Sequence, residues 1–157
     1  MVVLHPAVVR FAGARLEGVT RLTVDRSAAR EVEAWGDLGP YAVMADVAEQ
    51  RVTAEVRQTL TREALDGPRP GEAGELVAYT APAGSDAGRR KLTASAVVRS
   101  CVHRVGVGAR GGWGGAGRGG GSGGGGGEVA ERVIVFVLVS PDGAADPVTI
   151  GEAGSEV

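Results

Sequence analysis

A tract of nearly pure glycine divides this chain between two of its clearest β-strand patterns. Residues 106–127 read GVGARGGWGGAGRGGGSGGGGG, which is 15 glycines in 22 residues. Glycine brings no side chain to bury, and it loses more backbone entropy on ordering than any other residue. The tract cannot build a core, yet the strongly apolar residues 133–139 follow it closely. We therefore expect a long flexible loop inserted in a β domain.

The chain is long enough for one domain. Its 157 residues, less the glycine tract, leave about 135 for a core of modest size. We expect a single domain over residues 1–157, interrupted by the loop at 106–127 and ending in a frayed segment at 151–157.

Alternating apolar and polar residues predict the strands, because successive side chains of a strand point to opposite faces. Residues 50–60 alternate most regularly, with four apolar residues on one face: Val52, Ala54, Val56 and Leu60. Some of these also fit a helical spacing, but the valine and threonine content favours a strand. Similar patterns predict strands at residues 7–11, 19–26, 30–35, 75–80, 91–103, 133–139 and 146–150.

The same alternation predicts which side chains face the core. Residues 133–139 are apolar on both faces, as in a central strand that is covered on both sides. In the other strands the expected inward residues are Thr20, Leu22 and Val24; Val32 and Ala34; and Leu92, Ala94, Ala96, Val98 and Val102.

One short helix is expected at residues 61–65. Thr61 can cap it, Ala64 and Leu65 favour helix, and Gly67 can end it. The fold class that follows is mostly β: a single β-sandwich or barrel domain with one short helix and a long Gly-rich loop.

Charge and cysteine content argue against several classes of protein. The net charge is −2, from 17 basic and 19 acidic residues, whereas a dedicated nucleic-acid binder is usually strongly basic. Cys101 is the only cysteine, so no disulfide can form within the chain. The sequence begins without a signal-peptide pattern, and its longest apolar run is too short to cross a membrane. We expect synthesis in a cytoplasm and no membrane partner.

Few residues point to chemistry. Residues 106–111 match G-x-G-x-x-G, but no helix is expected after them, so a nucleotide site is not predicted. Cys101 and His103 share a face of one strand, yet a nucleophile also needs an orienting group and a pocket. His5 has no metal-ligand spacing to His103. We expect no cofactor, no metal and no enzymatic activity.

The glycine tract allows a binding function as an alternative. Arg110 and Arg118 each precede two glycines, and Trp113 lies between them. Such elements meet the phosphates and bases of single-stranded nucleic acid in other proteins. A small β module that binds single-stranded nucleic acid through Arg110, Trp113 and Arg118 is therefore our second hypothesis, and a passive spacer is the simpler interpretation.

The order of the elements resembles that of phage tail tube proteins. Residues 26–56, with the strand pair at 9–13 and 16–20, resemble the front half of that family. The resemblance implies a long loop at 28–50, a strand at 51–59, a short helix at 61–65 and a sheet closed by residues 92–104 and 131–140. The glycine tract is not a feature of the family.

The resemblance also implies a function. The chain would be a structural subunit of a phage or phage-derived tail tube, and it would assemble with itself into stacked, hexameric rings through which DNA passes. Its other partners would be tail proteins such as the sheath, baseplate or tail terminator. Its location would be the virion tail, after assembly in the bacterial host cytoplasm.

Two groups of residues are candidates for the subunit interface, since aromatic residues are enriched at the centres of interfaces. The first lies in a loop with two aromatics, and the second lies on the expected helix. A loop that folds onto its own core explains the first group equally well. The candidates are Trp35, Asp37, Leu38, Pro40 and Tyr41, and Thr61, Glu63 and Leu65.

Overall fold

The computed structural model describes residues 2–37, 39–60, 66–81, 88–106 and 129–152. This part is mostly β, as the sequence predicts, and it contains no helix. The helix expected at 61–65 lies outside the described residues. The nine strands are β1 (Val2–Leu4), β2 (Val8–Phe11), β3 (Ala14–Leu16), β4 (Val19–Trp35), β5 (Ala42–Leu60), β6 (Ala73–Tyr79), β7 (Arg90–Gly106), β8 (Val129–Val139) and β9 (Thr149–Glu152).

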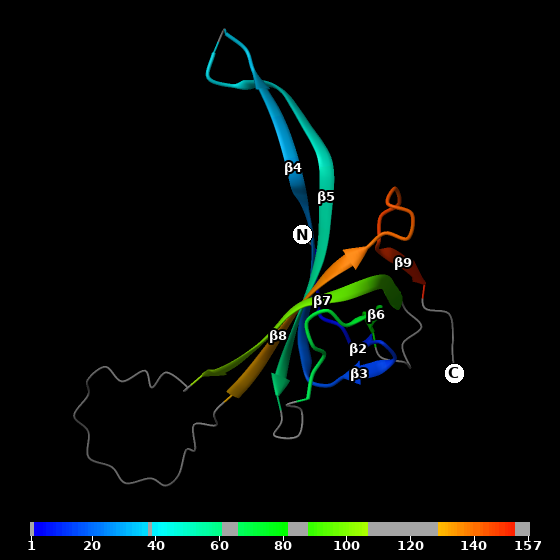
Figure 1. Ribbon diagram of the computed structural model, residues 1–157. Coiled ribbons are helices and arrows are strands. Elements are labelled where there is room, and N and C mark those ends of the chain that lie inside the picture. The colour runs from blue at the N-terminus through cyan, green and yellow to red at the C-terminus, as the bar shows by residue number, and fades with distance from the viewer. Residues whose placement is uncertain (1, 38, 61–65, 82–87, 107–128, 153–157) are drawn as a thin grey trace, which may run out of the picture.

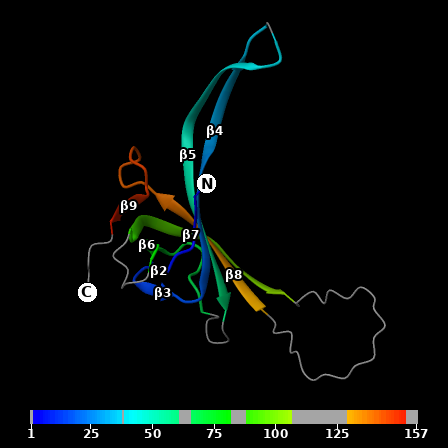
Figure 2. The ribbon, with the colours of Figure 1, turned by 180° about the vertical axis from the view of Figure 1, so that it is seen from behind.

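All the strands belong to one antiparallel sheet. Their order is β1-β4-β5-β8-β7-β6-β2-β3, and β9 pairs with β7 beyond the end of β8. Figures 1 and 2 show a compact body, from which the hairpin of β4 and β5 projects. β4 and β5 therefore contribute to the core within the body and form the projecting hairpin beyond it.

The sheet is rolled so that strands near its two ends come close together. β3 and β4 lie near opposite ends of the strand order, yet only Glu17 and Gly18 separate them in the chain. Both of these residues are held by β5. The amide of Thr59 donates to the carbonyl of Gly18 (2.9 Å), and Nε2 of Gln58 donates to the carbonyl of Glu17 (2.9 Å).

The hydrophobic core fills the inside of the roll. It comprises alternate residues of six strands together with Leu16 of β3 and Val148, which precedes β9. The rings of Phe11 and Phe136 lie at its centre, with centroids 4.9 Å apart. The predicted inward residues of residues 50–60 are confirmed for Val52, Ala54 and Val56. The core residues of the six strands are Val9, Phe11, Leu22, Val24, Val52, Ala54, Val56, Leu76, Ala78, Leu92, Ala94, Ala96, Val98, Ile134, Phe136 and Leu138.

A β-bulge corrects the prediction for residues 91–103. The register between β7 and β8 shifts between Val98 and Ser100, so Arg99 is an extra residue. After the shift, Cys101 packs against the core and Val102, predicted to point inward, lies outside it with 46% of its surface exposed. Thr20, which falls in a register shift between β4 and β5, is likewise exposed.

The largest correction concerns residues 28–50, for which the family resemblance implied a long loop, whereas the strand predicted at 30–35 from alternation is confirmed as part of β4. Residues 28–50 form a continuation of the β4–β5 hairpin, paired out to Trp35 and Ala42. Val32 and Ala34 were predicted to face a core, but no other strand among the described residues covers the hairpin there, and Val32 is exposed. At the C-terminus, β9 extends to Glu152, two residues into the segment that was expected to fray.

Gly18 provides a test of how the roll closes. Its φ is +66°, and a Cβ added there would lie 2.5 Å from the carbonyl oxygen of Thr59. We expect Gly18→Ala to lower the free energy of unfolding by about 2–3 kcal/mol, since it adds both left-handed strain and a backbone clash. Chemical denaturation measures this loss.

Gly13 is the matched control for this substitution. Its φ is also positive, at +81°, but no atom lies within 4 Å of the added Cβ. Gly13→Ala is expected to cost only about 1 kcal/mol. Equal losses for the two variants would contradict the proposed closure at Gly18.

Candidate assembly surfaces

The distal part of the β4–β5 hairpin, residues 27–50, is here called the arm. Strand pairs from Ser27 and Arg51 to Trp35 and Ala42 hold it together. At roughly 3.3 Å per residue, it extends about 25 Å beyond the body. Figure 1 shows that no other strand runs beside it. The register shifts at residues 28–31 fit its curved course, because bulges bend and twist a strand pair.

The arm leaves two strand edges open among the described residues. β1 pairs only with Leu22–Val24 of β4, and β8 pairs with β5 only from Val52 onward. Unpaired backbone N–H and C=O groups at such edges can accept a further strand. The arm therefore offers backbone as well as side-chain contacts.

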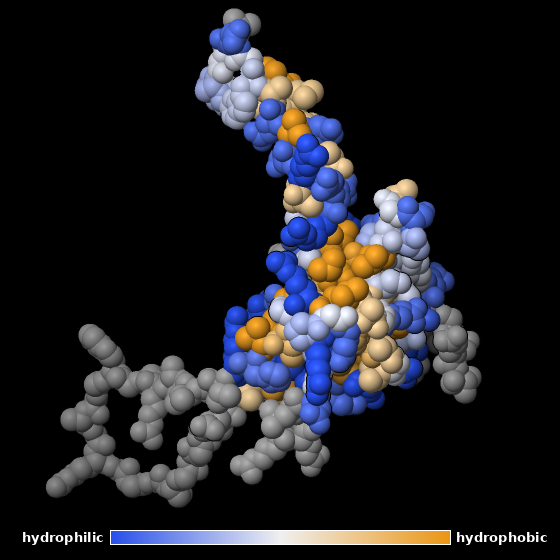
Figure 3. Space-filling model, in the orientation of Figure 1, coloured by the Kyte–Doolittle hydropathy of each residue, from blue (hydrophilic) through white to orange (hydrophobic). Residues whose placement is uncertain are grey.

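Large apolar side chains are concentrated on the arm. Nine are exposed among the described residues, and six of them belong to the arm: Val32, Trp35, Tyr41, Val43, Met44 and Val47. Tyr41 is 82% exposed and Val43 is 72% exposed. Figure 3 shows apolar residues among hydrophilic ones along the arm, and an apolar area on the body where the arm leaves it. Such a concentration of exposed apolar side chains on one element is typical of an interaction surface.

The charge of the arm is one-sided. Residues 31–48 contain four acidic residues and no basic residue: Glu31, Glu33, Asp37 and Asp46. Nearer the body, Arg30 and Glu49 face each other across the two strands, with Nη1 and Oε1 3.9 Å apart. A partner for the distal arm must therefore combine apolar groups with positive charge.

The base of the arm is fixed to the loop between β8 and β9. Nε and Nη2 of Arg26 both contact Oδ2 of Asp146, at 3.0 and 2.8 Å. The other carboxylate oxygen of Asp146 accepts a hydrogen bond from the amide of Val148 (2.9 Å). This amide, and then Arg26, lower the pKa of Asp146. Beside this contact, a groove of about 570 Å³ separates the arm from the loop.

The structure places the sequence-predicted interface residues as follows. Trp35, Asp37, Pro40 and Tyr41 lie together at the end of the arm, and all four are exposed. These four residues do not pack on a core, contrary to the alternative that this loop folds onto the core of its own chain. Leu38, Thr61, Glu63 and Leu65 lie outside the described residues, as do the alternative nucleic-acid contacts Arg110, Trp113 and Arg118.

Cys101 and His103 do share a pocket. Together with residues 66–70 they line a space of about 280 Å³. Burial raises the pKa of the Cys101 thiol, whereas a cysteine nucleophile requires a lowered pKa. The direction of this shift is opposite to the one that would activate the thiol.

A buried polar pair beside this pocket was not predicted from the sequence. Arg132 and Gln58 are almost fully buried, and Nε of Arg132 donates to Oε1 of Gln58 (2.9 Å). Gly67 lies against the guanidinium, so a side chain there would displace it. The sequence gave no sign of the pair, because the pairing depends on which strands become neighbours and in which register.

The comparisons with known proteins assign the chain to no family. No protein-family model matches the chain, and no curated protein matches it significantly in sequence. Among the described residues, no group of three or more histidine, cysteine or acidic side chains could hold a metal ion. No helix of sufficient length and apolarity to span a membrane occurs in that same part of the chain.

The contribution of the loop between β8 and β9 to the stability of the fold is expected to depend on pH through Asp142. Hydrogen bonds from the amides of Ala145 and Ala144 and from the Ser140 hydroxyl lower the pKa of Asp142 to about 2. A lowered pKa means that the carboxylate stabilises the fold above its unfolded value of about 3.9. This contribution is lost as the pH falls through the folded pKa of about 2.

We expect a carboxyl-carbon NMR titration to give Asp142 a midpoint near 2. The Ser140→Ala variant removes one of the three donors and should raise that midpoint. A midpoint for Asp142 near its unfolded value of about 3.9 would contradict the loop geometry.

Proposed function

We propose that this protein is a non-enzymatic structural subunit that assembles with copies of itself through the β4–β5 arm. The observation that carries the proposal is the projecting arm, with six of the nine exposed large apolar side chains of the described residues. Its apolar groups contribute nothing to the core of their own chain.

The energetics favour an arm that becomes buried on assembly. Full burial of a large apolar side chain stabilises by about 1.5–3 kcal/mol, so six such groups reach roughly 9–18 kcal/mol. Association costs an estimated 4–15 kcal/mol in lost freedom of motion. Val43 and Met44 are adjacent in β5 and therefore point to opposite faces of the arm, so the whole gain requires burial of both faces. Burial of most of the arm is then comparable to the cost of association, whereas burial of one side chain, at most about 3 kcal/mol, is smaller than that cost.

The shape of the subunit favours a head-to-tail contact. The arm points away from its own body, and its acidic residues disfavour a contact with a second arm, so we infer that a different surface of the next copy receives it. Contacts between two unlike surfaces build closed rings or open filaments, depending on the rotation between copies. Rings can stack into a tube, and an open helical filament can wind into one.

The specific assembly that we propose is a phage or phage-derived tail tube. The antiparallel rolled sheet and its projecting hairpin support this proposal. In such a tube, hexameric rings would stack into a conduit for DNA, and a net charge of −2 agrees with a wall that does not hold DNA tightly. Its partners would be further copies and other tail proteins such as the sheath, baseplate or tail terminator.

Substitutions on the arm test the proposal. We expect Trp35→Ser, Tyr41→Ser and Val43→Ser, combined in one chain, to convert assemblies into monomers, because they remove the largest exposed apolar groups of the arm. Light scattering after size-exclusion chromatography measures the mass. Circular dichroism should remain unchanged, since none of the three residues belongs to the core.

Ile150→Ser provides the matched control. Ile150 is 54% exposed but lies on β9, away from the arm. This variant should assemble like the unmodified chain. Assemblies of unchanged mass and concentration dependence in the triple arm variant would refute assembly through the arm.

Removal of the glycine tract tests whether assembly depends on it. β7 and β8 are paired as far as Gly106 and Val129, so the two ends of the tract lie opposite each other. Replacement of residues 107–128 by Asn-Gly, a sequence suited to a tight hairpin, should preserve both the melting temperature and assembly. Loss of assembly in this variant would assign the tract a role that our proposal does not give it.

A further inference from the structure

We propose that the arm of one copy docks on the convex face of β5, β8 and β7 of a second copy. This inference rests on the proposed function, because it identifies the surface that receives the arm. The face combines a partly exposed strip of valines with an excess of positive charge. These two properties complement the exposed apolar side chains and the acidic residues of the arm.

The valines of β8 form the centre of this face. Ile134, Phe136 and Leu138 point into the core, so the residues that alternate with them point outward. Outward residues of β7 extend the strip, since Val97 pairs with Val137 and Val102 pairs with Val133. The resulting valine strip consists of Val133, Val135, Val137 and Val139 of β8 and Val97 and Val102 of β7.

The valine strip lies outside the core cluster and is covered unevenly, since Val133 is only 6% exposed and Val97, Val135 and Val137 are half-buried. None of its six members belongs to the core cluster. Val139 is 44% exposed and Val102 is 46% exposed, at opposite ends of the strip. The sequence predicted a strand covered on both sides here, and in the described part of the chain the second side is only half covered. A second molecule can supply the missing cover.

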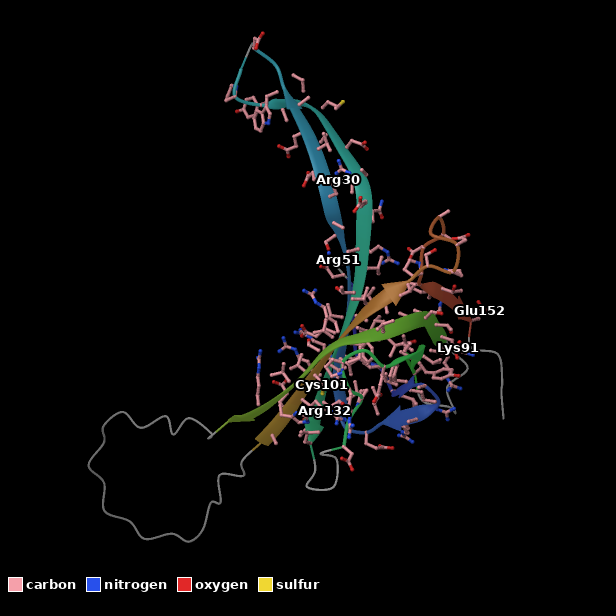
Figure 4. The ribbon with its side chains drawn as sticks, in the orientation of Figure 1. Arg30, Arg51, Lys91, Cys101, Arg132 and Glu152 are labelled. Carbon is pink, nitrogen blue, oxygen red and sulfur yellow. The ribbon has the colours of Figure 1, made fainter. Side chains whose placement is uncertain are left out.

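Positive charge borders the strip. The convex face of β5, β8 and β7 carries five basic residues and two acidic ones, which gives a net charge of +3 from 5 − 2. The distal arm has a charge of −4. Figure 4 shows Arg51 at the base of the arm and Lys91 near the far end of β7. The basic residues are Arg51, Arg57, Lys91, Arg99 and Arg104, and the acidic residues are Glu55 and Glu131.

The dimensions of the two surfaces agree. The strip runs along β8 from Val133 to Val139, which is about 20 Å at 3.3 Å per residue, and the arm is about 25 Å long. The arm is two strands wide, and the face spans three strands. An arm laid along β8 can therefore contact most of the strip.

The arm cannot reach the strip of its own chain. β5 pairs with β8 from Val52 and Leu138 onward, and the arm begins on the other side of this point. Since the arm continues β5 away from β8, only the face of another copy is accessible to it (Figure 1). The contact is therefore head-to-tail.

The groove at the base of the arm is a poorer receptor. Its charged residues are Arg26, Glu49 and Asp146, of which Arg26 is already paired with Asp146 and Glu49 with Arg30. Its net charge of −1 would repel the acidic arm. Charge thus selects the convex face over the groove.

Charge reversal on both surfaces tests the inference. One variant reverses the arm (Glu31→Lys, Glu33→Lys and Asp46→Lys), and the other reverses the face (Arg51→Glu, Arg99→Glu and Arg104→Glu). We expect each variant alone to assemble about 100-fold more weakly than the unmodified chain, because like charges then meet at the interface. Sedimentation velocity over a concentration series measures the change.

Restoration distinguishes a direct contact from general damage. An equal mixture of the two variants should co-assemble, and so should a single chain with both sets of reversals, since opposite charges meet again in both cases. A control chain with Arg10→Glu, Arg69→Glu and Arg90→Glu has the same change in net charge away from the strip. It should assemble normally.

Each outcome decides a different claim. Normal assembly of the face-reversed chain, or no restoration in the double-reversed chain, overturns the docking site and leaves assembly through the arm intact. A monomeric unmodified chain at every concentration overturns the proposed function as well. Circular dichroism verifies folding, and if the face-reversed chain unfolds, Arg→Gln at the same three positions should still weaken assembly about tenfold.

Discussion

The hydrogen-bonded ladder between β4 and β5 is the feature on which the rest of this structure depends. One continuous pair of strands runs from Val19 and Gln58 in the body to Trp35 and Ala42 at the end of the arm. Its inner half contributes Leu22, Val24 and Val56 to the core, and its outer half has no core to contribute to. The folded body therefore sets the direction of the arm, because the arm continues strands that the body holds in place.

This arrangement explains why an exposed apolar hairpin can persist. An isolated two-stranded hairpin is marginally stable in water. Here the pairing begins inside a folded sheet, and Arg26 ties the base of the arm to Asp146. The arm thus keeps a defined shape before it meets a partner, which reduces the entropy that association costs.

The sequence predicts the strands of the body well, because alternation has a simple cause there. Val52, Ala54 and Val56 alternate with polar residues since one face of β5 is buried and the other is not. The same alternation misleads at Val32, where β-prone residues continue but the core has ended. Alternation with a period of two residues indicates that a strand forms. It does not show whether another element covers that strand.

Two other features depend on information that a single strand does not contain. The bulge at Arg99 moves Val102 from the predicted core to the convex face, and only the pairing with β8 reveals it. The burial of Gln58 and Arg132 depends in the same way on which strands become neighbours. Of the candidate site, the sequence named Trp35 and Tyr41 as interface candidates, and the structure places both on the arm with exposed side chains. The convex face emerges only when β5, β8 and β7 are placed side by side.

The acidic arm and the convex face, on which basic residues border the valine strip, give the subunit two unlike surfaces. Such a subunit forms continuous assemblies when each copy both gives an arm and receives one. The tail tube that we propose is one assembly of this kind, and its charge distribution places the attractive groups at the joints between subunits. The overall charge near zero then results from opposite local charges on different surfaces.

Negative-stain electron microscopy of the purified full-length chain, over a series of concentrations, tests the central claim most directly. Our account predicts rings with a central hole, or tubes built from them, that increase with concentration. Particles no larger than a single chain at the highest concentration would contradict it.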